Sequence, residues 1–262
     1  MRILFVGINY WPEETGIAPF STGRAEYLAA RGHEVTFCTT FPYYPAWKLA
    51  REHRRSLISR EVRRGVTILR TRIYVPSRPN SFKRLFHEGS FVAASLSRML
   101  ARRRPDVIFV VSPPLGLAAA GLLLSKLWNV PYLFHVADLQ PDAAVDLGML
   151  QAGRLVNLLY RFEPTSYAGS GVVSTLTPAM RSRIVAKGIA ADKVVLFQDW
   201  TDPRLFDIPA SGGEDFRRAF GLEGKFLVTH AGNMGVKQGL EVVLEAAELS
   251  SRDPAYCIRV GG

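Results

Sequence analysis

Cysteine is scarce in this sequence, which has two among 262 residues, Cys38 and Cys257. Neither belongs to a CxxC pair or lies near a cluster of cysteine and histidine. A disulfide framework or a zinc site is therefore not expected, and a reducing compartment fits best. The N-terminus also lacks the apolar stretch of a signal peptide. These absences predict a cytoplasmic protein.

A long uninterrupted hydrophobic run is missing as well. The most apolar stretch, residues 107–128, is divided by Ser112, Pro113 and Pro114. Each part is shorter than the roughly 20 residues that a helix needs to cross a bilayer. Buried core is therefore the favoured interpretation of this stretch, and 48% hydrophobic residues suffice for the core of a soluble globular protein.

Acidic residues are sparse between Lys48 and Arg104. This basic segment has 16 Lys or Arg against 3 Asp or Glu, a charge of +13, whereas the rest of the chain has 17 against 20. A solvated face is one interpretation. Attraction to anionic lipid headgroups or to a phosphate-bearing lipid substrate is a second. Nucleic acid is disfavoured, because aromatic residues do not alternate regularly with the arginines.

Apolar runs alternate with helix-like segments along residues 1–200. Continuous apolar strands between helices are typical of a parallel sheet covered on both faces. The sequence therefore predicts an α/β fold, with a doubly wound N-terminal domain at 1–200. The predicted strands are 2–7, 33–39, 65–71, 106–112, 131–137, 171–175 and 193–198, and the predicted helices are 19–30, 82–103, 115–128, 153–168 and 178–188.

This periodicity ends at residues 201–222, a polar stretch with proline and glycine that is typical of an interdomain linker. A strand at 225–232, a helix at 240–249 and a strand at 256–262 follow. One strand, helix and strand cannot enclose a core. We therefore expect 223–262 to begin a second domain that is incomplete in this sequence.

The GxGxxG spacing of dinucleotide-binding folds and the Walker spacing of P-loops are both absent. Ligands of open parallel sheets bind beyond the carboxyl ends of the strands, and four segments occupy such positions. They are the loop "GINYWPEETGIAPF" with Glu13, Glu14 and Gly16; the stretch after His135 with Asp138 and Asp142; the strand end with Asp199; and the loop with Gly232, Asn233, Gly235 and Lys237.

Each candidate also has an ordinary structural explanation. Gly16 could serve only to make a turn, and His135 could be a hydrogen-bonded core histidine. Asp138 and Asp142 could be helix caps, and Lys237 could be solvated. A metal site is not expected, because the spacing of the acids and His135 matches no compact ligand set.

Taken in order, "ARGHEVTFCTT", "HVADLQPDAAVDLGML" and "HAGNMGVKQGLEVVLEAA" resemble segments of the retaining family-4 glycosyltransferases with the GT-B fold. The resemblance covers nearly the whole chain and is greatest to bacterial enzymes of colanic acid, capsule and O-antigen assembly. In that family two Rossmann-like domains face each other across a cleft. The nucleotide-sugar donor lies mainly against the C-terminal domain.

The resemblance implies roles for several residues. Gly16 would pack against the donor diphosphate or the acceptor, and His135 would contact the donor sugar. Lys237 would pair with the diphosphate, which Gly232 and Gly235 would allow to approach closely. Asn233 stands where the family usually has arginine, so phosphate binding would depend more on Lys237 and the backbone. Glu13, Glu14, Asp138, Asp142 and Asp199 are candidates for contact with the acceptor or the cleft.

The family also has two glutamates separated by seven residues, and these are expected beyond Gly262. The sequence is then either a fragment of a longer enzyme, inactive by itself, or an inactive remnant. The implied function is sugar transfer, with retention, from a nucleotide-sugar to a lipid-linked glycan in exopolysaccharide or O-antigen synthesis. No cofactor is implied, and the enzyme would lie on the inner membrane face. A non-catalytic N-terminal module that binds acceptor or membrane and a sugar-nucleotide epimerase of the same fold are the alternatives.

Overall fold

The computed structural model describes residues 1–140, 142, 145, 153–201, 203–207, 209, 211–232, 234, 235 and 238–261. These residues form two compact units, Met1–Asp199 (unit 1) and Trp200–Gly262 (unit 2).

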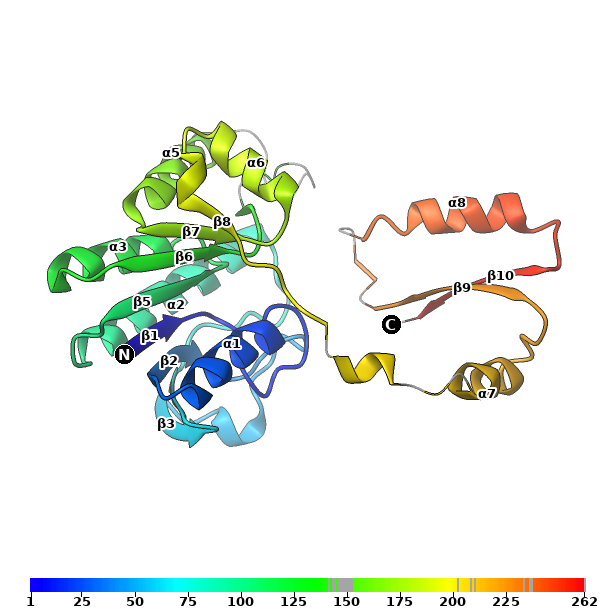
Figure 1. Ribbon diagram of the computed structural model, residues 1–262, viewed down its shortest axis with the longest axis horizontal. Coiled ribbons are helices and arrows are strands. Elements are labelled where there is room, and N and C mark those ends of the chain that lie inside the picture. Colours follow the sequence, from blue (N-terminus) through cyan, green and yellow to red (C-terminus); the bar gives the residue numbers. More distant parts are fainter. Residues whose placement is uncertain are drawn as a thin grey trace. The chain divides into compact units, whose positions relative to one another are not determined.

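Unit 1 is built on an eight-stranded sheet with the order β3-β4-β2-β1-β5-β6-β7-β8 (Figure 1). All neighbouring strands are parallel except β3 and β4. The predicted α/β class with a mostly parallel sheet is therefore confirmed. The strands are β1 (Arg2–Val6), β2 (Glu34–Thr40), β3 (Ile58–Arg63), β4 (Val66–Thr71), β5 (Val107–Ser112), β6 (Tyr132–Val136), β7 (Val172–Thr175) and β8 (Val194–Leu196).

Both faces of this sheet are covered, as the continuous apolar strands predict. In β1, Ile3 and Phe5 belong to one buried cluster, whereas Leu4 and Val6 belong to another. The first cluster includes Ala25 of α1, and the second includes residues of α2, α3, α5 and α6. Among its described residues, the helices of unit 1 are α1 (Ala18–Ala30), α2 (Ser81–Leu100), α3 (Leu117–Trp128), α5 (Arg154–Gly169) and α6 (Pro178–Ala186), with the short 3-10 helices η1 (Arg51–His53) and η2 (Ala191–Lys193).

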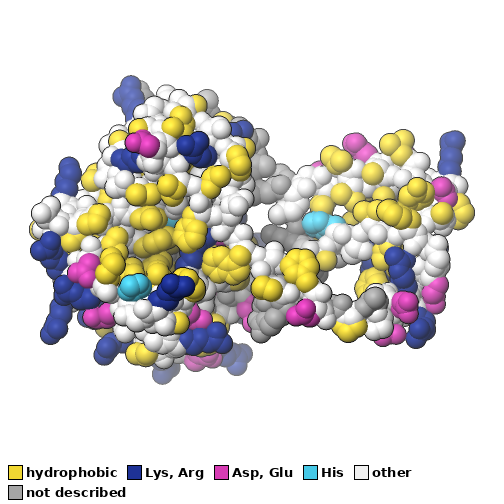
Figure 2. Space-filling view, in the orientation of Figure 1, with side chains coloured by type: hydrophobic (Ala, Val, Ile, Leu, Met, Phe, Trp, Pro, Cys, Tyr) yellow, Lys and Arg dark blue, Asp and Glu magenta, His cyan; other side chains and the backbone are white. Residues whose placement is uncertain are grey.

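β3 was not predicted, because its sequence "ISREVR" lies in the arginine-rich segment that suggested a solvated face. It pairs antiparallel with β4 at the edge of the sheet, where charged side chains can remain in solvent. Glu61 of β3 accepts a hydrogen bond from Arg70 Nε of β4 at 2.6 Å. Figure 2 shows Lys and Arg side chains along the margin of unit 1 where Figure 1 places β3. The charged segment thus contains a regular strand.

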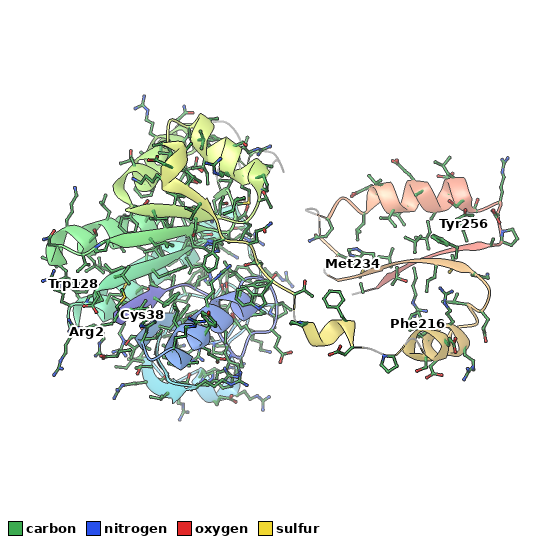
Figure 3. All side chains as sticks on the ribbon, in the orientation of Figure 1. Arg2, Cys38, Trp128, Phe216, Met234 and Tyr256 are labelled. Atoms are coloured by element: carbon green, nitrogen blue, oxygen red, sulfur yellow. The ribbon has the colours of Figure 1, made fainter. Side chains whose placement is uncertain are left out.

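Unit 2 contains a two-stranded parallel sheet, with bounds close to those predicted. The stretch expected to be only a linker also forms a helix, α7, which contributes to this unit. Phe216, labelled in Figure 3, and Phe220 contact the guanidinium of Arg259 at 5.3 and 3.6 Å from the ring centroids. The elements are η3 (Pro203–Phe206), α7 (Ser211–Ala219), β9 (Phe226–Ala231), α8 (Glu241–Ser250) and β10 (Tyr256–Gly261).

Candidate functional site

His135 lies in the middle of unit 1, near the carboxyl end of β6, and is completely buried. Its Nδ1 is 2.9 Å from Oγ of Ser174, the residue opposite it on β7. Its Nε2 is buried and has no hydrogen-bond partner among the described residues. Burial, with a smaller contribution from the charge of Arg24, lowers the pKa of His135 to about 3. The imidazole is therefore neutral at neutral pH.

A buried arginine approaches this histidine from α1. The guanidinium of Arg24 lies 4.7 Å from the ring centroid of Phe197, whose ring is 5.9 Å from that of His135. Arg24 Nη2 also donates a hydrogen bond to Asp199 Oδ1 at 2.5 Å. The structure thus links two predicted site residues, His135 and Asp199, through Phe197 and Arg24.

Neither Arg24 nor Ser174 was predicted from the sequence, although one signal pointed to the arginine. Arg24 lies three residues after Ser21 and one before Ala25, and all three side chains are buried. An arginine in phase with the buried face of a helix needs a partner. Burial lowers the pKa of Arg24, and it raises the pKa of Asp199 despite the opposing effect of Arg24.

Glu13 is buried and connects two loops beyond the carboxyl ends of β1 and β2. Its Oε1 accepts hydrogen bonds from the backbone N–H groups of Tyr43 and Tyr44, each at 2.8 Å. Its Oε2 accepts a hydrogen bond from Asn9 Nδ2 at 2.7 Å. Both carboxylate oxygens thus have partners within the protein, which gives Glu13 a structural role. Glu14 is exposed.

Gly16 adopts the left-handed conformation, with φ +62°. A Cβ atom at this position would meet only Tyr44 Cε1, at 3.8 Å, which is an ordinary contact. The backbone conformation, rather than crowding by neighbouring protein atoms, therefore explains the glycine here. The contact of Gly16 with a ligand stays a prediction.

An aromatic cluster joins the loop at 41–47 to α2. The ring of His87, a buried residue of α2, lies 5.2 Å from Trp47, and its Nε2 is 3.0 Å from the hydroxyl of Tyr43. Burial lowers the pKa of His87. The sequence showed an aromatic loop at 41–47 but gave no sign of its partner on α2.

Gln140 connects α2 to the segment after β6. Its Nε2 donates to Glu88 Oε1 at 3.0 Å, and its Oε1 accepts from the backbone N–H of Leu115 at 2.5 Å. Burial raises the pKa of Glu88, and the charge of Asp138 adds to this effect. Asp138 thus lies near the carboxylate of Glu88, which was not a predicted site residue.

Asp142 is part of an ion-pair cluster. Lys187 Nζ is 2.8 Å from Asp142 Oδ2 and 2.5 Å from Oε2 of Glu163, which is completely buried. The hydroxyl of Tyr167 donates to Glu163 Oε1 at 2.6 Å. Lys187, which was not a predicted site residue, therefore explains the position of Asp142 without a ligand.

In unit 2, Gly232 follows β9 and donates its N–H to the backbone carbonyl of Gly261 at 3.0 Å. The backbone N–H of Gly235 donates to Gln238 Oε1, also at 3.0 Å. Asn233 and Lys237 lie outside the described residues. The predicted role of this loop in binding diphosphate stays a prediction.

No helix among the described residues is both long enough and apolar enough to cross a membrane. Within the same residues, no group of three or more His, Cys, Asp or Glu side chains is placed to hold a metal ion.

Residues 15–200 match the model of the family described as "Glycosyl transferase 4-like domain". The chain is 37% identical over 268 residues to a protein of Escherichia coli (strain K12), provisionally named as the colanic acid biosynthesis glycosyl transferase WcaI. That alignment covers 100% of this chain and 66% of the relative.

Two solved structures share the fold at low identity. Anabaena Alr3699/HepE in complex with UDP-glucose is similar with a TM-score of 0.58 and 16% identity, over 99% of this chain and 60% of that chain. The UDP-GlcNAc 2-epimerase of Neisseria meningitidis bound to UDP-GlcNAc has a TM-score of 0.52 and 16% identity, over 99% and 65%. At this identity the likeness concerns the fold alone.

Proposed function

This chain belongs to the glycosyl transferase 4-like family, and we propose that it transfers a sugar from a nucleotide-sugar donor to a lipid-linked glycan in exopolysaccharide synthesis of the colanic acid type. The observation that carries this proposal is the 37% identity, along the whole chain, to a protein named for colanic acid biosynthesis. A solved structure of the same fold holds UDP-glucose, which supports a nucleotide-sugar as the donor.

We propose that Nε2 of His135 contacts the donor sugar when the donor is bound. A neutral imidazole whose Nε2 has no partner in the described protein can exchange a hydrogen bond with a sugar hydroxyl, without the cost of burying a charge. Ser174 would hold the ring in place through Nδ1. His135 is thus proposed to position the donor sugar.

The proposed reaction retains the configuration of the anomeric carbon. The bond from this carbon to the diphosphate oxygen breaks with its electron pair, and the acceptor oxygen bonds on the same face. The acceptor proton passes to the leaving diphosphate. Lys237 and the backbone near Gly232 and Gly235 would stabilise the charge that develops on that diphosphate. No nucleophilic side chain and no cofactor is needed.

The acceptor is proposed to be a lipid-linked glycan at the cytoplasmic face of the membrane. The basic segment from Lys48 to Arg104 supports this location, since clustered Lys and Arg attract anionic headgroups. The loop at 41–47 also carries the partly buried aromatic side chains Tyr44 and Trp47, which are of the kind that contact sugars.

The alternatives have less support. An epimerase shares the fold, but the family match and the curated relative both carry the name of a glycosyl transferase. A non-catalytic module would bind acceptor or membrane without transfer. In residues 223–262 no two glutamates have seven residues between them, since Glu241 and Glu248 have six, and we propose that residues 1–262 alone do not complete the reaction.

Transfer is tested with the product of the whole reading frame, with residues 1–262 for comparison. Each protein is incubated with UDP-, GDP- or dTDP-sugars and membrane lipid extract. Release of nucleoside diphosphate, mass spectrometry of the lipid product and NMR of its new linkage are the readouts. We expect one donor to give a product with retained configuration. A free epimerised nucleotide-sugar, or no product from any donor, would contradict the proposal.

The role of His135 is tested in the same assay with His135→Asn. We expect a loss of about a hundredfold or more in transfer, since productive orientation of the sugar depends on that contact. A melting temperature close to that of the wild type would show that the variant is folded. Transfer at the wild-type rate would leave His135 with a purely structural role.

A further inference from the structure

The outward face of the first turns of α2 is apolar, although surface helices ordinarily direct apolar residues inward. Phe82 is 78% exposed, Phe86 is 61% exposed, and Leu85 lies between them with 42% exposed. The opposite face of α2 already supplies the core through His87, Phe91, Ser95 and Met99. The exposed aromatics thus lie outside the buried clusters formed by the described residues of unit 1.

These side chains form one continuous surface. Phe82, Leu85 and Phe86 line a pocket of about 360 Å³ together with Gly89 and Ser90. The exposed ring of Tyr74, from the segment after β4, contacts Phe86 edge to face with 5.2 Å between the centroids. We call Tyr74, Phe82, Leu85 and Phe86 the aromatic patch.

Basic residues outnumber acidic ones in the sequence around this patch, where the nearest acid, Glu88, accepts a hydrogen bond from Gln140. Residues 62–87 contain seven Lys or Arg and no Asp or Glu. Lys83 and Arg84 lie on α2 itself, and Arg78 precedes the helix. Two residues before Tyr74, exposed Arg72 donates through Nη1 to the backbone carbonyl of Arg54, another exposed arginine. Several basic residues thus lie close in sequence to a group of exposed aromatic rings.

We propose that the aromatic patch inserts into the headgroup layer of an anionic lipid bilayer, with the neighbouring Lys and Arg side chains contacting lipid phosphates. A bilayer offers apolar chains and negative charge within one interface, which is the combination that this surface complements. Helices lying in such an interface bury their apolar face about 5–10 Å deep and gain attraction from basic residues.

The inserted surface adjoins the aromatic cluster described above. Phe86 precedes His87, whose ring contacts Trp47 and Tyr43 on the other side of the helix. Arg84 lies 5.3 Å from the centroid of the Trp47 ring. Insertion of α2 would therefore hold this aromatic cluster at the lipid surface. The inference rests on the proposed function and deepens it, because a lipid-linked acceptor in the bilayer would then lie next to this aromatic cluster.

The test measures vesicle binding without nucleotide-sugar or acceptor, so that its outcome is independent of the transfer assay. Vesicles of phosphatidylglycerol and phosphatidylcholine in equal parts are sedimented with the protein, and vesicles of phosphatidylcholine alone are the comparison. We expect binding to the anionic vesicles, weakened by salt. Phe82→Ser with Phe86→Ser should lower the binding at least about tenfold, because two aromatic side chains no longer leave water.

Matched variants of unit 2 control for a general change in surface apolarity. Phe206, 79% exposed, and Leu249, 85% exposed, resemble Phe82 and Phe86 in exposure. Phe206→Ser with Leu249→Ser should leave vesicle binding unchanged. Arg78→Gln with Lys83→Gln should weaken it severalfold, whereas exposed Arg252→Gln should not.

Insertion itself is measured with a tryptophan in the patch. Relative to the wild type, whose four tryptophans give the background, Phe82→Trp should add fluorescence that brominated lipid quenches, and the fluorescence that Phe206→Trp adds should not be quenched. Equal quenching of the two variants, or wild-type binding by the Phe82→Ser, Phe86→Ser protein, would overturn the proposal. It would also fail if sedimentation without lipid showed a dimer that this double variant abolishes, since a second copy would then cover the patch.

Discussion

Arg24 Nη2 and Asp199 Oδ1 form a hydrogen-bonded ion pair across 175 residues of the chain. Arg24 is on α1, and Asp199 is the last residue of unit 1. The contact of the same guanidinium with Phe197 adds a second attachment. The end of unit 1 is therefore fixed to its first helix beside His135.

Asp199→Asn should destabilise unit 1. Loss of one member of a buried ion pair costs about 3–5 kcal/mol, and the partial exposure of Asp199 places the expected loss near the lower value. Thermal and urea denaturation measure it. Exposed Asp207→Asn is the control, and equal stability of the two variants would show that the Arg24 pair contributes nothing.

Glu13→Ala should loosen the contact between the loops at 7–17 and 41–47. The backbone N–H groups of Tyr43 and Tyr44 lose their acceptor, and buried unsatisfied donors cost about 1–3 kcal/mol each. Hydrogen exchange at these two amides should accelerate, and the melting temperature should fall. The neighbouring exposed Glu14→Ala should change neither, and a matching effect there would refute this role of Glu13.

His135 should make stability depend on pH. Its pKa is about 3 in the folded protein and about 6.5 when unfolded, so between these values the unfolded state binds more protons. The free energy of unfolding should be highest above about pH 6.5 and fall as the pH drops toward 3. Denaturation across this range should give a smaller slope for His135→Asn than for the wild type. Parallel curves would contradict burial of a neutral imidazole.

Two glycines of unit 1 should respond oppositely to alanine. Gly16→Ala should cost about 1–2 kcal/mol, since alanine is strained at φ +62°. Gly89→Ala, in a helix with open space at the Cβ position, should gain about 1 kcal/mol. Each kcal/mol should move the melting temperature by about 2–4 °C. A stabilising Gly16→Ala would disprove the conformational explanation of this glycine.

The strands of unit 1 with continuous apolar sequences were predictable, because a strand buried on both faces has apolar residues at successive positions. β1 and β5 are examples. β3 was not predictable in this way, since its stability comes from backbone pairing with β4 while its side chains remain charged. α7 could not be predicted for a related reason: Phe216 within it and Phe220 just after it pack on Arg259, a partner about forty residues later in the sequence.

The candidate site also has parts that the sequence predicted and parts that it did not. The position of His135 at the end of a strand was predicted from the sequence, and Asp199 was already a candidate site residue. The link between them depends on contacts of Arg24 with Phe197 and Asp199, which follow β8 much later in the chain, and no local pattern encodes such contacts. Likewise, the spacing of Asp138 and Asp142 could not reveal that the first lies near Glu88 and the second pairs with Lys187.

The two edge strands of the large sheet should influence aggregation of the protein at high concentration. An outer strand with free backbone groups can recruit a strand from another molecule. At one edge of the sheet, β3 carries Arg60 and Arg63. At the other edge, β8 is only three residues long. Charge repulsion on one side and too short a template on the other should both oppose growth of the sheet into aggregates.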